Sequence, residues 1–466
     1  MSRNTMSLPP TLDLLSIRNY YQKGGSPFDL FDQLYNRILN DQSDYCNTWI
    51  SLRPLSQVHS ILKQLEAASL SDKPLWGVPF SVKDNIDVLD LPTTAACPSF
   101  SYLPEHSATV VQNLERAGAI CLGKTNLDQF ATGLNGTRSP YGPCTSVFNS
   151  KFISGGSSSG SAVSVSLHQV CFSIGTDTGG SGRIPASLNN VVGLKPTCGT
   201  LSIKGLVPCC PSVDCPSVFA LSVADAIEIA SILSHSDGSD PSLRSDVYRS
   251  NFNLDGDISV ASVLVPSDND LEFFGNDEGK TLYLSLLQRL EESTLPIRKF
   301  DFAPLQEAGK FLFDGPFLAD RFLSVGSFVQ ANRSAVLDTT LSILSNATTV
   351  SGTDVFEAFA RLKHLKSYVQ DLAGPNDLFI FPTLAPLYTV SQLIENPVEL
   401  NTNIGHYSYF ANILDMSALS VPIGFYSNGM PFGVTLMGLP FRDSFLAQFA
   451  VSVLKVDDLS LGLPRS

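Results

Sequence analysis

Several signals that mark common protein classes are missing from this sequence. No stretch of 18 or more apolar residues occurs, so we predict no membrane-spanning helix. The N-terminus lacks a basic region followed by an apolar core, so no signal peptide is indicated. Basic residues are in the minority, because 30 Lys and Arg stand against 44 Asp and Glu and give a net charge of -14. Such a surface repels nucleic acid and anionic lipid, so we expect neither as a partner.

Metal and disulfide signatures are also weak. The six histidines are scattered and share no metal-ligand spacing. All nine cysteines fall between Cys46 and Cys215, and an odd number without regular spacing argues against a disulfide framework. Cys209, Cys210 and Cys215 resemble part of a zinc site, but no fourth ligand follows at a recognised spacing. We therefore expect no metal and a reducing compartment, with the cytoplasm as the default location.

The sequence has enough apolar material for a large core, since 43% of its 466 residues are hydrophobic. Helical patterns alternate with short apolar runs, which predicts one α/β domain with a mixed sheet. We expect an outer helical layer over residues 1–75, a catalytic core segment over 76–215, and a remainder over 216–466 that completes the core and supplies pocket helices. Residues 234–257 are polar and are predicted to form a surface insertion. A parallel part of the sheet would place functional residues at strand ends.

The most informative stretch runs from Gly155 to Arg183. Glycine-serine clusters at 155–160 and 179–182 enclose a helical run of small residues and then an apolar run, 170–174, typical of a buried strand. A flexible linker is the alternative, but a linker is not interrupted by a buried strand. Glycines let backbone N–H groups point at an oxyanion, which makes Ser181 a candidate nucleophile. The G-x-S-x-G elbow is absent, so Ser181 needs a base from elsewhere.

Lys83 is the candidate base. It follows an apolar run, Val78 to Val82, that predicts a short buried strand. Burial disfavours the ammonium form and lowers the pKa of a lysine, which suits it to accept a proton near neutral pH. The alternative is a solvated strand terminus with no chemical role. A Ser-His-Asp triad also stays open, because triads are assembled in space and not in sequence.

Three segments together resemble the amidase signature hydrolases. They are Gly155-Gly156-Ser157-Ser158, Asp177-Thr178-Gly179-Gly180-Ser181-Gly182-Arg183, and Lys83 at the end of its strand, in the order of that family. The resemblance implies an α/β amidase signature fold, with a large mixed sheet covered by helices on both faces. It implies that Ser181 is the nucleophile, that Ser157 is a bridging serine in a cis peptide, and that Lys83 is the base. No metal or organic cofactor is implied.

An amide needs an activated nucleophile, a proton for the departing nitrogen, and donors for the oxyanion. Neutral Lys83 can take a proton from Ser181 through Ser157 and return it to the leaving group. An acyl-enzyme on Ser181 then reacts with water. The expected oxyanion hole consists of the N–H groups of Thr178, Gly179, Gly180 and Ser181.

A closer resemblance, to the allophanate hydrolases that form the amidase part of urea amidolyases, covers nearly the whole chain. The segments that carry it are 124–138, 315–321, 401–405 and 431–436. This resemblance implies hydrolysis of a small urea-derived amide with release of ammonia. It implies that Gly133 and Arg321 hold the urea and carboxylate ends of the substrate, and a planar, permanently charged fork suits a carboxylate. The alternative for Arg321 is a surface pair with Asp320 or another acid.

Some positions depart from the allophanate hydrolase pattern. Phe313 stands where that family has a tyrosine that contacts the substrate, and phenylalanine lacks the phenolic hydrogen bond. Gly179 stands where alanine is common. We expect a single amidase domain over residues 1–466, without the small C-terminal domain that completes breakdown of the first product. The alternatives are an amidase for another small neutral or apolar amide, and an amidase-fold subunit of an amidotransferase assembly. A homodimer is left open.

Overall fold

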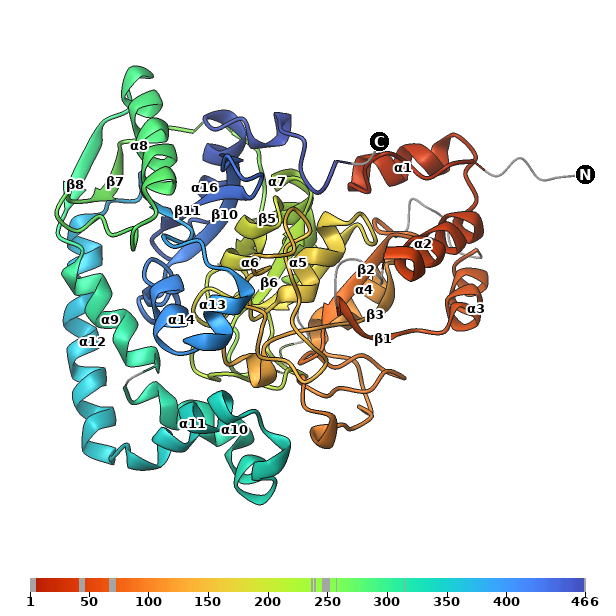
Figure 1. Cartoon of the computed structure of the whole chain (residues 1–466). Helices are drawn as coiled ribbons and strands as arrows, with labels where there is room; N and C mark the ends of the chain where they lie inside the picture. Colours follow the sequence, from red (N-terminus) through yellow and green to blue (C-terminus); the bar gives the residue numbers. More distant parts are fainter. Residues whose placement is uncertain are drawn as a thin grey trace, which may run out of the picture.

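A mixed sheet forms the centre of the molecule (Figure 1). The structure, a computed structural model, describes residues 6–464 except 42–46, 67–72, 236, 237, 239, 245–251, 257 and 314. Within these residues the sheet has eleven strands. The strands are β1 (Trp49–Leu52), β2 (Pro79–Lys83), β3 (Ile120–Thr125), β4 (Phe172–Thr176), β5 (Val192–Lys195), β6 (Pro216–Ala220), β7 (Ser262–Pro266), β8 (Ile297–Phe300), β9 (Asp377–Pro382), β10 (Ser417–Phe425) and β11 (Pro431–Gly438).

The spatial order of the strands is β1-β3-β2-β4-β6-β5-β10-β11-β9-β7-β8. Strand β2 is parallel to both β3 and β4, and β7 is parallel to both β8 and β9. The remaining neighbours are antiparallel. The sheet is therefore mixed, as predicted, and its parallel group β3-β2-β4 brings three C-terminal strand ends to one edge.

Helices pack against both faces of the sheet. Helices α5 and α6 contact each other and the central strands, whereas α4, α7 and α16 form a second layer (Figure 1). Helices α8, α9 and α12 lie on the side of the molecule that carries β8, α10 and α11 lie at the bottom of the view, and α1 to α3 lie on the side that carries β1 (Figure 1). The helices are α1 (Leu14–Gln22), α2 (Pro27–Asp41), α3 (Leu55–Leu65), α4 (Thr109–Arg116), α5 (Ser159–Ser166), α6 (Arg183–Leu188), α7 (Val223–Leu233), α8 (Asp277–Glu292), α9 (Ala303–Phe313), α10 (Phe317–Ala331), α11 (Asp338–Ser345), α12 (Gly352–Leu372), α13 (Val390–Glu395), α14 (Glu399–Ile404), α15 (Phe410–Ile413) and α16 (Asp443–Ser452).

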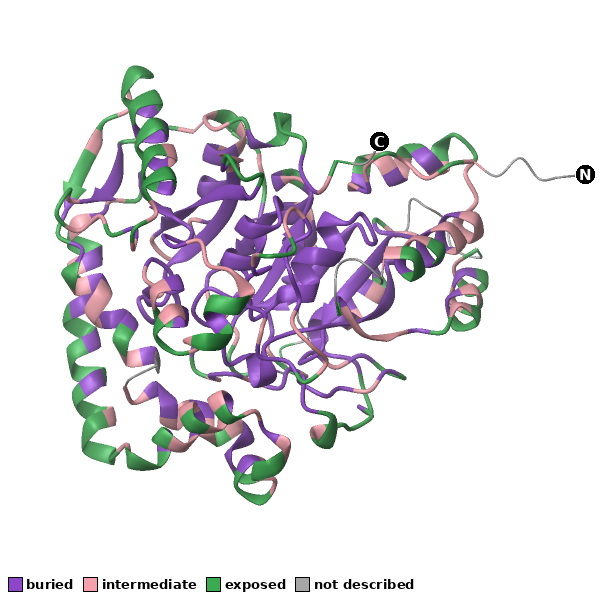
Figure 2. Ribbon diagram, in the orientation of Figure 1, coloured by how far each residue is buried: buried purple, intermediate pink, exposed green. Residues whose placement is uncertain are grey.

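Helix α5 is buried on every side, and its sequence explains how. It reads SGSAVSVS, and all of its residues are buried (Figure 2). Small side chains let its backbone approach the sheet closely, and at Gly160 an added Cβ would lie 2.2 Å from the Thr48 carbonyl oxygen. The Gly/Ser stretch is thus the inner packing layer of the fold. The linker alternative is wrong.

The predicted helical layer over residues 1–75 needs a correction. It contains α1, α2 and α3, but also strand β1, which pairs antiparallel with β3 at the sheet edge. Strand β1 has only four residues and is half-buried, so it carries none of the continuous apolar run by which the central strands are recognised. The predicted insertion at 234–257 lies partly outside the described residues.

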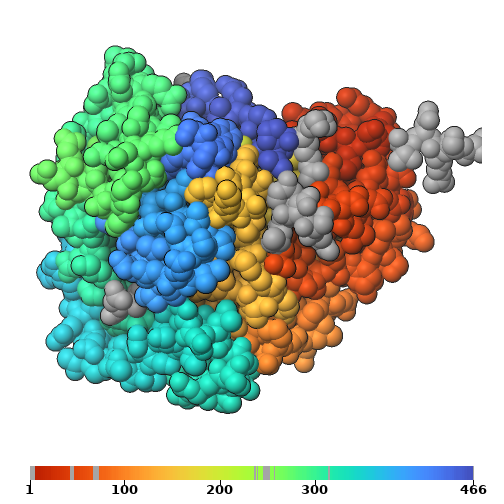
Figure 3. All heavy atoms as spheres, in the orientation of Figure 1, coloured from red at the N-terminus to blue at the C-terminus, as the bar shows by residue number. Residues whose placement is uncertain are grey.

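The N-terminal and C-terminal parts of the chain lie on either side of the segment near residue 150. Figure 3 shows the yellow segment near residue 150 between the red N-terminal part and the green to blue C-terminal half. Residues far apart in sequence therefore surround the segment that carries Ser157. No helix among the described residues is long and apolar enough to cross a membrane.

A buried ion pair beside the β2–β3 strand ends gives a stability prediction. Lys124 Nζ lies 3.0 Å from Asp84 Oδ1, and neither side chain is exposed. Lys124→Ala should lower the free energy of unfolding by about 3–5 kcal/mol, because it leaves a buried carboxylate without its cation. The control Lys299→Ala removes the exposed ion pair with Asp268. It should change the free energy of unfolding by about 1 kcal/mol or less. If urea unfolding shows the same loss of unfolding free energy for both variants, the distinction between the buried and the exposed ion pair is contradicted.

Candidate active site

The candidate catalytic residues lie at the C-terminal ends of parallel strands, as the sequence predicted. Lys83 is the last residue of β2, and Thr176 is the last residue of the neighbouring parallel strand β4. Ser157 and Ser158 immediately precede α5, and Ser181 follows β4 in the turn that leads into α6. The parallel pairing therefore brings together residues that are almost 100 positions apart in sequence.

A continuous hydrogen-bonded chain joins the three predicted catalytic side chains. Lys83 Nζ lies 2.8 Å from Ser157 Oγ, and Ser157 Oγ lies 2.9 Å from Ser181 Oγ. The peptide bond between Gly156 and Ser157 is cis, as the family resemblance implied. Among the described residues no histidine is hydrogen-bonded to Ser181, so the Ser-His-Asp alternative has no geometric support.

Lys83 is fully buried, which excludes the solvated strand terminus. Burial lowers the pKa of Lys83 from 10.5 to about 8, although the nearby Cys209, Asp128, Asp214 and Asp177 act in the opposite direction. A second hydrogen bond, of 2.7 Å, joins Nζ to Thr176 Oγ1. A neutral amine has two N–H groups and one lone pair, so it can donate to Thr176 while accepting from Ser157.

The turn before Ser181 is organised by a buried ion pair. Asp177 Oδ2 accepts from Arg183 Nε at 2.8 Å and from the Gly182 N–H at 3.0 Å, while Oδ1 accepts from the Gly180 N–H at 2.7 Å. Burial alone would raise the pKa of Asp177, but Arg183 and these hydrogen bonds hold it below its usual range. Gly180 has a φ of +137°, a conformation that requires glycine.

The members of the predicted oxyanion hole differ in their hydrogen bonding. The Gly180 N–H already donates to Asp177 Oδ1 at 2.7 Å. The N–H groups of Thr178, Gly179 and Ser181 make no hydrogen bond to any described residue. The donors available beside Ser181 are therefore these three N–H groups.

Gly133 lies in a loop that is tied to the catalytic serines. The Asp128 N–H donates to the Ser157 carbonyl at 3.1 Å, and the Asp128 carboxylate accepts from the N–H groups of 135, 136 and 138. A Cβ at Gly133 would lie 2.6 Å from Asp128 Oδ2, so the loop needs glycine there. Asn401 Oδ1 accepts from the Leu134 N–H at 2.8 Å. The structure thus brings together segments 124–138 and 401–405, which the sequence singled out separately.

Arg321 belongs to α10 and is 2% exposed, so the predicted alternative of a surface pair is wrong. Its Nη1 donates to Cys209 Sγ at 2.8 Å. Although burial acts against it, the proximity of Cys209, Cys210 and Asp214 raises the pKa of Arg321, so it remains a cation. Cys209 also interacts electrostatically with Lys83.

Phe313 is the last residue of α9, and α10 begins at Phe317. The side chain of Phe313 lies outside the described residues. Its place in a substrate pocket stays a prediction that rests on the family resemblance.

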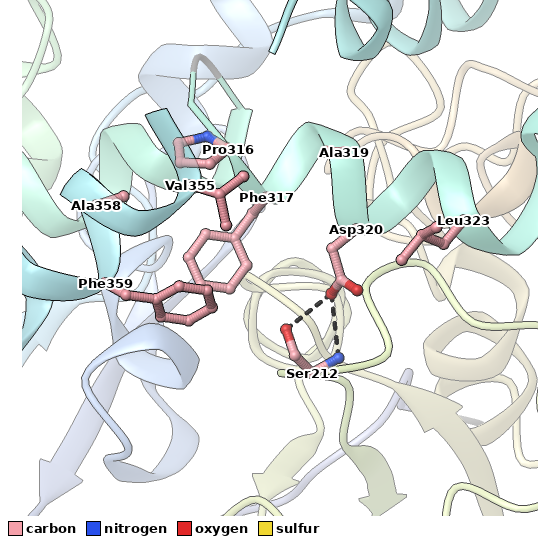
Figure 4. A pocket seen from close by; sticks show the side chains of 9 residues that line it. All are labelled: Ser212, Pro316, Phe317, Ala319, Asp320, Leu323, Val355, Ala358 and Phe359. Carbon is pink, nitrogen blue, oxygen red and sulfur yellow. Dashed lines mark hydrogen bonds between the residues drawn. The ribbon is translucent and has the colours of Figure 1, made fainter. Parts of the chain in front are cut away.

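An apolar pocket of about 260 Å³ lies between α10, α12 and Ser212, and Arg321 does not line it (Figure 4). Asp320 lines it and is hydrogen-bonded to the backbone and side chain of Ser212, at 3.1 and 2.7 Å. None of the predicted catalytic residues lines this pocket. It is therefore not the place where Ser181 meets a substrate.

Sequence analysis missed two residues that contact the catalytic set. Thr176 binds Lys83, and Asp128 binds the backbone of Ser157. Thr176 could have been found from the pairing of parallel strands, because the end of β4 lies beside the end of β2. Its predicted strand ended at Ile174, two residues early. Asp128 carried no comparable signal, since a polar residue in a loop is common.

Comparisons with known proteins agree with this geometry. The family model described as Amidase matches residues 30–446. The urea amidolyase of Saccharomyces cerevisiae is 40% identical over 409 residues, which cover 87% of this chain and 22% of that protein. The chain thus spans about a fifth of the length of the urea amidolyase that it matches.

Two further relatives are similar over most of their own length. The structure of Kluyveromyces lactis allophanate hydrolase superposes with a TM-score of 0.88 at 36% identity and covers 97% of this chain and 74% of that one. A glutamyl-tRNA(Gln) amidotransferase subunit from Lawsonia intracellularis is 31% identical over 411 residues, 80% of this chain and 82% of that protein. The chain is therefore similar over most of its length both to an allophanate hydrolase and to an amidotransferase subunit.

The buried state of Lys83 gives a prediction that does not depend on catalysis. Because the pKa of Lys83 is about 8 in the folded protein and 10.5 in an ordinary environment, the unfolded chain holds the extra proton between these pH values. The wild type should therefore gain stability relative to Lys83→Met as the pH rises from about 8 to 10.5. At about 1.4 kcal/mol per pH unit the gain is about 3 kcal/mol. A difference in unfolding free energy that stays constant over this range would contradict the burial of a titrating Lys83.

Proposed function

The chain belongs to the amidase family, hydrolases that act on C–N amide bonds, and on that premise we propose that it hydrolyses allophanate through Lys83, Ser157 and Ser181. The observation that carries the catalytic assignment is the hydrogen-bonded chain of these three side chains beside open backbone N–H groups. The similarity to allophanate hydrolase and urea amidolyase supports the substrate. Those proteins are longer, and their further activities lie outside this proposal.

The hydrogen-bonded chain can carry a proton in either direction, because each hydroxyl both donates and accepts. With Lys83 neutral, Ser157 donates to Nζ and Ser181 donates to Ser157. As Ser181 Oγ attacks the amide carbon, its proton passes to Ser157 and the proton of Ser157 passes to Lys83. Only the uncharged amine can accept it, so turnover rises with pH as Lys83 loses its charge around pH 8.

The attack places negative charge on the carbonyl oxygen. The N–H groups of Thr178, Gly179 and Ser181 are the proposed donors for that oxyanion, in a site where Ser181 itself is only 3% exposed. Collapse of the tetrahedral intermediate breaks the C–N bond, and the proton held by Lys83 returns through Ser157 to the leaving nitrogen. Ammonia departs and leaves an ester on Ser181. Water, activated by the same relay, then hydrolyses the ester.

Arg321 is proposed to hold the carboxylate of allophanate. A buried guanidinium kept as a cation is suited to bind a carboxylate through two hydrogen bonds. Gly133 is proposed to contact the urea end, since its loop is anchored to the backbone of Ser157. The two contacts would orient the scissile amide toward Ser181.

A second candidate, hydrolysis of a more apolar neutral amide, is favoured by one observation. Phe313 stands where allophanate hydrolases carry a tyrosine, so that contact cannot contribute a phenolic hydrogen bond. The 31% identity to an amidotransferase subunit makes glutamine a third amide to test.

The function is tested by measuring ammonia release from allophanate, biuret, malonamate, glutamine and one neutral aryl amide. We expect the highest kcat/KM for allophanate, because only a small urea-derived carboxylate satisfies both ends of the site. Ser181→Ala should abolish turnover and retain the wild-type melting temperature. Efficient hydrolysis of the aryl amide with no turnover of allophanate would contradict the substrate assignment. Retained activity in folded Ser181→Ala would contradict the nucleophile.

The carboxylate contact has its own test. Arg321→Ala should raise KM for allophanate about tenfold or more, since charge-assisted hydrogen bonds contribute roughly 1.5–3 kcal/mol. Arg361→Ala, which removes an exposed arginine paired with Glu307, is the control and should leave KM unchanged. Phe313→Tyr should improve or preserve allophanate turnover and should slow turnover of an apolar aryl amide. Unaltered allophanate kinetics in a folded Arg321→Ala enzyme would remove the argument for a bound carboxylate.

A further inference from the structure

The oxyanion turn is held from two sides, and only one of them involves the Asp177–Arg183 pair. That pair binds the N–H groups of Gly180 and Gly182, which lie in the second half of the turn. Thr178 and Gly179 supply two of the three open N–H groups, and they lie in the first half. That first half has two contacts of its own: Ser408 Oγ donates to the Gly179 carbonyl at 2.7 Å, and Thr178 is bound through its side chain.

A second buried carboxylate, that of Asp214, holds the side chain of Thr178. Thr178 Oγ1 donates to Asp214 Oδ1 at 2.5 Å. Asp214 also accepts from the N–H groups of Cys210 and Cys209, at 3.1 and 2.8 Å, and is 5% exposed. Each of its oxygens therefore has at least one donor, and the carboxylate is locked in one orientation.

The sheet sets the position of Asp214 relative to the turn. Asp214 lies two residues before β6, which pairs antiparallel with β4, and the Asp177 N–H donates to the Cys215 carbonyl at 2.7 Å. Asn412 Nδ2 bridges the two segments by donating to the Asp177 and Val213 carbonyls, at 2.6 and 2.9 Å. Asp214 thus stands on a rigid support opposite Thr178.

We propose that Asp214 is a positioning residue for the oxyanion hole. Its carboxylate holds Thr178 so that the N–H groups of Thr178 and Gly179 face the oxygen of the carbonyl group whose carbon Ser181 attacks. The inference deepens the proposed function and rests on its assignment of the nucleophile. It does not depend on which amide is the substrate.

The raised pKa of Asp214 indicates a role in activity more than a contribution to stability. Burial raises the pKa of Asp214 to about 6, although its hydrogen bonds from Thr178, Cys210 and Cys209 and the charge of Arg321 act in the opposite direction. A carboxylate that is harder to ionise in the folded protein reduces stability at neutral pH. Such groups are concentrated at functional sites.

Asp214 also acts on the base. It is one of the negative groups that raise the pKa of Lys83 against the effect of burial, together with Cys209, Asp128 and Asp177. The groups that interact with Asp214 itself include Arg321 of α10 and the thiols of its own loop. Loss of the Asp214 charge should therefore lower the pKa of Lys83, whereas a merely structural residue would not shift it.

The test uses Thr178→Val, Thr178→Ser and Asp214→Asn in the full chain. Thr178→Val keeps the size and the N–H group but removes the hydroxyl, and we expect kcat to fall about tenfold or more, with KM within about threefold. Complete loss of an oxyanion donor lowers kcat by roughly 10²–10³, so a displaced donor should have a smaller effect. Thr178→Ser restores the hydroxyl and should recover most of the rate.

Asp214→Asn should lower kcat to a similar extent and move the ascending limb of the pH–rate profile to lower pH. Ser212→Ala is the matched control, because it removes the contact with Asp320 on the outer side of the same loop (Figure 4) and leaves Asp214 in place. It should have wild-type kinetics. Wild-type kcat in Thr178→Val, or an unshifted limb in folded Asp214→Asn, would overturn the inference.

Each variant is measured with the fastest amide of the panel and also with p-nitrophenyl acetate, which acylates serine and carries no carboxylate. Hydrolysis by Ser181→Ala serves as the blank. If allophanate is not hydrolysed but the variants slow acylation by the ester, the substrate proposal fails and the role of Asp214 stands. If the variants acylate at the wild-type rate, the role of Asp214 fails whatever the substrate is.

Discussion

The proposed chemistry of this protein depends on one lysine that is removed from water. Lys83 has no exposed surface, and its amine is held between Ser157 and Thr176 at 2.8 and 2.7 Å. Burial lowers the pKa of Lys83 to about 8, which makes an uncharged amine available near neutral pH. The surrounding negative groups limit this effect, so the lysine stays close enough to its titration point to accept and return a proton.

The fold supplies what such a lysine requires. Parallel pairing of β2 with β4 sets Lys83 beside Thr176, and the small residues of α5 let Ser157 approach from the adjoining loop. The turn after β4 then presents Ser181 with three backbone N–H groups that make no other hydrogen bond among the described residues. Buried carboxylates support this turn from both sides, Asp177 through Gly180 and Gly182 and Asp214 through Thr178.

Much of this could be predicted from the sequence. Lys83 and Ser181 were proposed from a buried strand end and from glycine-serine clusters, and Ser157 from the family resemblance. Strands β2 and β4 were recognised by their apolar runs. Strand β1 was missed because it is short and half-buried at the edge. Motif position also did not show that the Gly180 N–H is bound to Asp177. Asp214 could not be linked to Thr178, since 36 residues separate them and only the β4–β6 register brings them together.

The proposed substrate end of the site centres on the buried cation Arg321. Arg321 lies in α10, and its contact with Cys209 joins it to the loop that carries Asp214. The proposed carboxylate contact and the proposed oxyanion hole are therefore both connected to one loop.

The central claim is that Ser181 becomes acylated through the relay to Lys83. It is tested most directly by quenching the enzyme with acid during turnover of the best amide and measuring the mass of the peptide that contains Ser181. The account predicts that this peptide carries the acyl group in the wild type, that the adduct forms much more slowly in Lys83→Met, and that it is absent in Ser181→Ala. An acyl group on another residue, or turnover without any adduct under conditions where deacylation is slow, would contradict it.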